Sequence, residues 1–194
     1  IDELRGRDPE LADIMTVPLS AILYKVSSRS SDTDPTWVRR NIARGAACRY
    51  FAQRIELLAD GLADLARRPG KLPEVILADA RSLGERLGVG AVAGIVTSPP
   101  YAGTYDYAEQ HRLRFDFLAL RHRDFTEGEI GARRTFDRGG ESAVSWRRQL
   151  AEMLTMMARV LVPSGRAALV IGDSMAAGYA HFADEDLRAA MIGE

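Results

Sequence analysis

The sequence is poor in residues that bind metals or form disulfides. It has one cysteine, Cys48, and three histidines scattered along 194 residues. A single cysteine excludes an internal disulfide, and the histidines do not have the spacing of a zinc site. We therefore expect no bound metal, and we expect Cys48 to be a small buried apolar residue of a helix.

The sequence also lacks a membrane or export signal. No apolar run approaches the roughly 20 residues needed to cross a bilayer, and no basic segment followed by an apolar one opens the chain. Hydrophobic residues make up 46% of the chain, as in a packed globular domain. We expect a folded cytoplasmic protein without a membrane partner. Because the first residue is Ile, we also expect a part of a longer protein.

An excess of positive charge is absent as well, since the formal net charge is -1. This argues against nonspecific coating of nucleic acid. The arginines are nevertheless concentrated between residues 112 and 148. They are either solvated helix faces with acidic neighbours or a rim that contacts phosphates. The residues concerned are Arg112, Arg114, Arg121, Arg123, Arg133, Arg134, Arg138, Arg147 and Arg148.

The first third of the chain has the pattern of helices around a polar loop. Apolar residues at helical spacing predict a helix or a helix pair over 9–24, with Pro18 breaking or restarting the turn. Residues 27–35 are too polar for a regular element and predict a loop. Thr36 would then cap a long helix that extends to about Arg67.

Three short apolar runs follow, at 75–78, 92–96 and 167–171. Each has the pattern of a strand buried in a parallel sheet. A short helix over 81–87 separates the first two, and an amphipathic helix over 145–161 precedes the third. This alternation predicts an open α/β sheet with right-handed crossovers.

The chain is accordingly expected to have two parts. The first is a helical segment, 1–72, with the polar loop at 27–36. The second, 73–194, is an α/β core with an insertion at 101–141 that is rich in aromatic residues, arginine and glycine. Long excursions at the carboxyl ends of parallel strands are where α/β proteins place binding and chemistry. We expect the functional site there.

The second predicted strand continues directly into Thr97-Ser98-Pro99-Pro100-Tyr101. The prolines fix φ and remove two backbone donors, so nearby carbonyl groups are held rigidly and point into a pocket. An exocyclic base amine is a poor nucleophile because its lone pair is delocalised into the ring. If the Ser98 hydroxyl and the Pro99 carbonyl accept its two hydrogens, the nitrogen is driven toward a form that attacks a methyl donor. Tyr101 would stack on an extruded base.

The peptide TSPPY, with ILADARSL upstream and RVLVPSGRAALVIGDS downstream, resembles the catalytic region of the S-adenosylmethionine-dependent DNA amino-methyltransferases. Serine in the first motif position resembles their N4-cytosine branch. The resemblance covers about residues 75–174. It implies a partial Rossmann-like α/β sheet, a turn at Pro163-Ser164-Gly165, S-adenosylmethionine as cofactor, and methyl transfer to a flipped cytosine in DNA.

The resemblance also suggests roles for single residues. An acidic residue in the position of Asp79 lies near the adenine of the cofactor in this family, although Asp79 is also placed to cap the next helix. Tyr107 has packing as an alternative role. The candidate catalytic residues are Ser98, Pro99, Pro100 and Tyr101, the cofactor candidates are Asp79, Ala80 and Thr97, and the substrate candidates are Tyr105, Tyr107 and Arg112.

One family feature is missing from the sequence. No glycine-rich turn follows a strand and precedes a helix, and Gly88-Val89-Gly90 precedes a predicted strand instead. The turn would lie upstream or in another chain. Alternatives therefore stay open: methylation of N6 of DNA adenine, methylation of N2 of a tRNA guanine, or a noncatalytic nucleic-acid-binding subunit. A separate specificity or nuclease component is a further possible partner.

Overall fold

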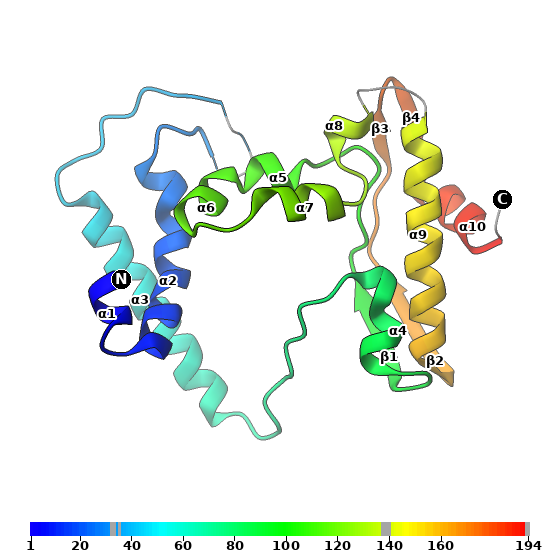
Figure 1. Ribbon diagram of the computed structural model, residues 1–194, viewed down its shortest axis with the longest axis horizontal. Helices are drawn as coiled ribbons and strands as arrows, with labels where there is room; N and C mark the ends of the chain where they lie inside the picture. The colour runs from blue at the N-terminus through cyan, green and yellow to red at the C-terminus, as the bar shows by residue number, and fades with distance from the viewer. Residues whose placement is uncertain (32–33, 35, 137–140, 193–194) are drawn as a thin grey trace. The chain divides into compact units, whose positions relative to one another are not determined.

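The computed structural model describes residues 1–31, 34, 36–136 and 141–192. Over these residues the chain is a mixed α/β protein with a small parallel sheet. It divides into two compact units (Figure 1). The first contains residues 1–74 and 108–123, and the second contains residues 75–107 and 124–194. Residues 108–123, which we placed in an insertion of the α/β core, thus belong to the helical unit.

The first unit is built from helices. Asp8 accepts a hydrogen bond from the Leu11 amide at 2.9 Å and caps α2, which packs against α3. Pro18 is buried inside α2, so the prediction of a break there is wrong. Burial of the helix face outweighs the one backbone bond that proline removes. The helices are α1 (Asp2–Arg5), α2 (Pro9–Ile22), η1 (Leu23–Val26), α3 (Ala46–Arg67), α5 (Tyr107–Gln110), which begins in the second unit, and α6 (Arg112–Phe117).

The long helix α3 begins at Ala46, so the prediction that Thr36 caps it is wrong. The Thr36 carbonyl accepts a hydrogen bond from the Ser30 amide at 2.9 Å, across the polar loop. A helix cap would instead direct that carbonyl to the first turn of the helix. Gly45, at φ 75°, precedes the helix. Of the predicted loop, Asp32, Thr33 and Pro35 lie outside the described residues.

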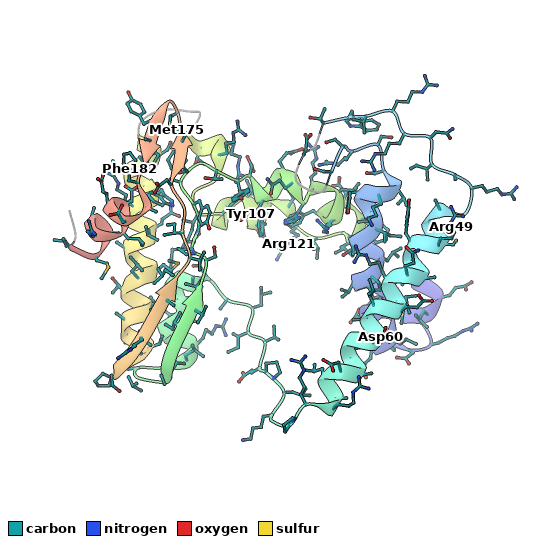
Figure 2. All side chains as sticks on the ribbon, turned by 180° about the vertical axis from the view of Figure 1, so that it is seen from behind. Arg49, Asp60, Tyr107, Arg121, Met175 and Phe182 are labelled. Carbon is teal, nitrogen blue, oxygen red and sulfur yellow. The ribbon has the colours of Figure 1, made fainter. Side chains whose placement is uncertain are left out.

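Cys48 is exposed on α3, which corrects the expectation of a buried residue. The reason is that α3 buries little of its surface. Ala46 is its buried residue, and Leu57 is 61% exposed. Arg49 and Asp60, labelled in Figure 2, are exposed positions on the same helix.

The second unit contains the parallel sheet. Strand β1 (Val92–Thr97) pairs in parallel with β2 (Leu161–Leu169), which confirms a parallel strand at 92–96. The predicted burial of this strand is wrong, since Val96 is 85% exposed. Helix α9 (Glu141–Val160) runs beside β2, with α4 (Leu83–Leu87) and α10 (Ala183–Ile192) packed against it (Figure 1). The remaining elements are η2 (Ala80–Ser82), α7 (His122–Gly128), which begins in the first unit, α8 (Arg133–Phe136), β3 (Ser174–Ala176) and β4 (Tyr179–His181).

The core of this unit lies along one face of α9. Buried residues recur at helical spacing there and pack against Ala102, Phe136 and Ala176. This face fixes the position of α9 beside the sheet. The buried residues of α9 include Trp146, Leu150, Met153, Met157 and Val160.

One predicted strand is absent from the sheet. Residues 75–78 form no strand, and Val75 and Leu77 are 91% and 98% exposed. A strand needs a neighbour for its backbone groups, and within the described part of the chain none pairs with this segment.

The third predicted strand is confirmed at 167–169, but β2 begins earlier, at Leu161, and ends at Leu169. The predicted turn at Pro163-Ser164-Gly165 lies within it as an irregularity. Val92 pairs with Leu161, whereas Gly94 pairs with Arg166, so β2 accommodates the extra residues in a bulge.

Candidate active site

Six of the predicted site residues line one pocket at the carboxyl end of β1. The pocket has a volume of about 300 Å³. This is at the lower end of the roughly 300–1,000 Å³ range of small-ligand sites. Its lining residues are Ser98, Pro99, Pro100, Tyr101, Tyr105 and Tyr107.

The hydroxyl of Ser98 is oriented by the backbone that follows β2. Its Oγ lies 3.0 Å from the Val170 carbonyl oxygen, to which it donates a hydrogen bond. The Tyr101 hydroxyl lies 3.4 Å from both the Ser98 Oγ and the Val170 carbonyl oxygen. A serine hydroxyl has one proton and two lone pairs, so donation to Val170 leaves the oxygen able to accept. Sequence reasoning missed Val170, because its role comes from a backbone atom.

The two proline carbonyls of the motif differ in their partners. The Pro100 carbonyl oxygen accepts a hydrogen bond from Nε1 of buried Trp146 at 3.1 Å. Among the described residues, none donates a hydrogen bond to the Pro99 carbonyl oxygen. The Pro99 carbonyl can therefore accept a hydrogen bond from a ligand, next to the Ser98 hydroxyl.

Three tyrosines, which we call the aromatic arm, form one side of the pocket: Tyr101, Tyr105 and Tyr107. The ring centroids of Tyr101 and Tyr105 are 6.1 Å apart, and those of Tyr105 and Tyr107 are 5.3 Å apart. Tyr107 begins α5 and is labelled in Figure 2. Burial raises the pKa of its phenol, with a further contribution from the other two tyrosines. The arm thus presents neutral aromatic rings, which suit a planar, uncharged ligand.

A segment far along the chain holds the backbone of the aromatic arm. We call this segment, residues 129–134, the brace. The Glu129 Oε1 accepts a hydrogen bond from the Tyr107 amide at 2.6 Å. The Arg133 amide donates to the Tyr105 carbonyl at 2.8 Å. The brace therefore holds the backbone of Tyr105 and Tyr107, and no residue pattern in the sequence indicated this pairing.

An ion cluster anchors the brace. The Arg134 Nη1 lies 2.6 Å from the Glu129 Oε2 and also binds Asp106, and the Arg134 Nη2 donates to the Thr126 carbonyl at 2.9 Å. The Glu129 side chain is 4% exposed. Burial opposes the charge of Arg134, but its bonds to Glu129 and Asp106 outweigh that effect and raise its pKa. The guanidinium therefore stays charged and ties the brace to the aromatic arm.

The predicted cofactor residues do not line this pocket. Asp79 caps η2 through the Arg81 amide at 2.8 Å, and both its carboxylate oxygens bind the Arg81 side chain. The hydrogen bond from Arg81 holds the pKa of Asp79 below its ordinary value of 3.8. Thr97 uses its carbonyl to accept from the Val170 amide at 2.9 Å.

These observations do not fit S-adenosylmethionine at Asp79, Ala80 and Thr97. The Asp79 carboxylate is engaged by Arg81, and the chain lacks a glycine-rich turn between a strand and a helix. The described residues thus build a pocket at the carboxyl end of β1, and they do not build a cradle for the cofactor.

Several of the clustered arginines are paired with acids. Arg112 belongs to the first unit, where its Nη1 lies 3.6 Å from Glu109. Arg147 binds Asp186 at 2.7 Å, and Arg134 lies in the ion cluster. Arg112 thus has the acidic neighbour expected of an exposed helix face, whereas Arg134 and Arg147 pair with the buried carboxylates of Glu129 and Asp186. Arg138 lies outside the described residues.

Two kinds of feature are absent from the described part of the chain. Its His, Cys, Asp and Glu residues form no group that would hold a metal ion. Its helices include none with the length and apolar character needed to span a membrane. Comparisons of this chain with protein-family models, curated proteins and solved structures find no match.

Proposed function

We propose that this chain acts in methyl transfer from S-adenosylmethionine to an exocyclic amine of a nucleic-acid base, N4 of cytosine in DNA. The observation that carries the proposal is the pair of acceptors in the pocket. The Ser98 hydroxyl directs its proton to the Val170 carbonyl, and the neighbouring Pro99 carbonyl has no donor among the described residues. Two adjacent acceptors match the two hydrogens of an amino group.

The acceptors would raise the reactivity of the amine directly. When both N–H groups donate to oxygen atoms, the lone pair of the nitrogen is less delocalised into the ring and becomes available for attack. The Ser98 and Pro99 oxygens would also stabilise the positive charge that develops on the nitrogen. No covalent bond between enzyme and base is needed.

The aromatic arm would hold the base in place. Stacking of a base on an aromatic ring contributes about 1–3 kcal/mol, which offsets the few kcal/mol that extrusion from a duplex costs. Tyr101 is nearest the acceptors, since its hydroxyl lies 3.4 Å from the Ser98 Oγ. The parallel pair of β1 and β2 would form part of a Rossmann-like sheet, with the base bound at the carboxyl end of β1.

The proposal is tested by transfer of a labelled methyl group. The chain is incubated with methyl-labelled S-adenosylmethionine, unmethylated genomic DNA and total RNA, and the nucleic acids are digested to nucleosides. Label in N4-methylcytosine is the expected result. Label in N6-methyladenine or N2-methylguanine would keep the chemistry and change the target. Absence of label from every nucleoside, both with this chain alone and with the chain joined to a segment or partner that carries the glycine-rich turn, would contradict the proposal.

A second candidate function is favoured because Asp79, Ala80 and Thr97 do not form a site for S-adenosylmethionine. With the Asp79 carboxylate engaged by Arg81, the chain would be a nucleic-acid-binding subunit without its own transfer activity. Calorimetry distinguishes the two functions. Binding of DNA without binding of S-adenosylmethionine supports the subunit, whereas binding of both supports the enzyme.

A further inference from the structure

The buried indole of Trp146 lies directly behind the pocket. Trp146 is 2% exposed and packs in the core with Phe136 and Leu150. Its Nε1 is the polar atom of the side chain, and it donates to the Pro100 carbonyl at 3.1 Å. A buried indole N–H needs a partner, and the core packing of α9 fixes where that donor points.

A glycine of the brace allows the indole to approach the motif closely. Gly131 has a φ of 71°, which favours glycine. A Cβ at this position would lie 2.8 Å from the Tyr101 carbonyl oxygen and 2.9 Å from the Trp146 Cδ1. Both groups therefore pack against the bare Cα of Gly131. The indole therefore contacts the motif directly through Pro100, and Gly131 lies against both the indole and the Tyr101 carbonyl.

We propose that Trp146 is a positioning residue for the two amine acceptors. The rings of Pro99 and Pro100 fix their φ angles, so the segment between Ser98 and Tyr101 has few ways to move. Anchoring its Pro100 carbonyl then sets the direction of the Pro99 carbonyl and the position of Ser98. The inference rests on the proposed function, because the acceptors matter only if an amine binds there.

Replacement of Trp146 by phenylalanine tests the role in catalysis. Trp146→Phe keeps an aromatic ring in the core and removes the N–H donor. We expect kcat for methyl transfer to fall by about tenfold or more, because misplacing reacting groups by a fraction of an ångström slows a reaction strongly. We expect the KM for DNA to change less than about twofold, because the aromatic arm is unchanged. Leu150→Val, in the same buried cluster, is the control and should leave kcat near the wild-type value. Equal losses of kcat in the two variants would overturn the inference.

A readout that needs no activity separates this inference from the proposed function. NMR of tyrosine-labelled full chain, with the Tyr101 signals assigned by Tyr101→Phe, reports the motif directly. The Tyr101 ring signals should shift in Trp146→Phe and stay in place in Leu150→Val. Unchanged Tyr101 signals in Trp146→Phe would overturn the inference. If the wild-type chain transfers no methyl group even when the glycine-rich turn is supplied, the proposed function fails, and the positioning of the motif by Trp146 is then decided by these signals.

The wild-type chain gives a further check in case Trp146→Phe does not fold. Trp37 is 81% exposed and provides an internal comparison. The indole proton of Trp146 should exchange with solvent at least about a hundredfold more slowly than that of Trp37, because it is buried and hydrogen-bonded. Equal exchange rates would overturn the inference.

Discussion

At the scale of the residue, the chemistry of the pocket depends on where one proton is placed. Serine is a donor and an acceptor, so its presence at position 98 does not by itself define its role. The Val170 carbonyl, 3.0 Å away and 72 positions along the chain, receives the hydroxyl proton. The lone pairs of the Ser98 oxygen are thereby available to a ligand. Position in the fold, rather than residue type, makes Ser98 an acceptor.

Replacement of Ser98 by alanine should lower methyl transfer. We expect Ser98→Ala to raise the activation free energy by about 2–4 kcal/mol, the usual effect of losing one transition-state hydrogen bond, while the affinity for S-adenosylmethionine stays nearly constant. Steady-state kinetics with labelled donor measure the change.

The control for this variant is Ser174→Ala. Ser174 also donates its hydroxyl to a backbone carbonyl, that of Ala102 at 2.8 Å, but it does not line the pocket. It should retain wild-type turnover. Unchanged turnover in Ser98→Ala would remove Ser98 from the mechanism.

At the scale of the element, the brace gives the aromatic arm its shape. The arm has little regular structure, and α5 is only one turn long. Its conformation depends on the Glu129 carboxylate, which binds the Tyr107 amide and Arg134 at 2.6 Å each. Removing this buried carboxylate is costly, because the Arg134 guanidinium and the Tyr107 amide then lose a partner that water cannot easily replace.

Glu129→Gln should therefore destabilise the arm more than it changes the chemistry. Glutamine keeps an acceptor for the Tyr107 amide and loses the charge that pairs with Arg134. We expect the free energy of unfolding of the second unit to fall by about 1–3 kcal/mol, since one partner of a buried pair is neutralised while Asp106 still binds Arg134. Denaturant titration followed by tryptophan fluorescence measures it, in a Trp37→Phe background that leaves Trp146 as the fluorophore.

A matched acid-to-amide change on the surface serves as the control. Asp64→Asn removes the charge of an exposed carboxylate whose Oδ2 lies 2.6 Å from the Arg68 Nη2. Exposed pairs contribute about 0–1 kcal/mol, so stability should barely change. If Asp64→Asn lowered the free energy of unfolding as much as Glu129→Gln does, burial of the ion cluster would not account for the loss of stability.

At the scale of the whole molecule, the two units differ in how much core they have. The buried apolar residues of the first unit are few and small, and Ile22 is the largest of them. The second unit buries Phe136, Trp146 and Leu150 together with two methionines. Because burial of apolar surface is the main source of stability, the second unit should be the more stable one.

Hydrogen exchange should resolve this difference within one sample. We expect backbone amides in the middle of α3 to exchange at least about tenfold faster than those in the middle of α9, because α3 buries so little of its surface. Mass spectrometry of peptides from the two helices measures the rates. Leu150→Ala, which empties a core site at a cost of about 2–5 kcal/mol, should speed exchange in α9 and leave α3 unchanged. Equal exchange in both helices would show that the units unfold together.

The sequence by itself determined those features that depend on local pattern. The apolar run at 92–96 and the periodicity of 145–161 predicted β1 and α9, since both patterns are local in the sequence. The peptide Ser98 to Tyr101 likewise indicated acceptors beside an aromatic ring, because proline restricts the backbone wherever it occurs.

Only the tertiary structure decided which groups meet. The segment at 75–78 has the apolar pattern of a strand but no partner for its backbone within the described residues, and a strand depends on that partner. The Val170 carbonyl, the Trp146 indole and the Glu129 carboxylate reach the motif from distant positions. Such contacts depend on how the elements pack, and packing brings together residues whose separation along the chain has no regular pattern.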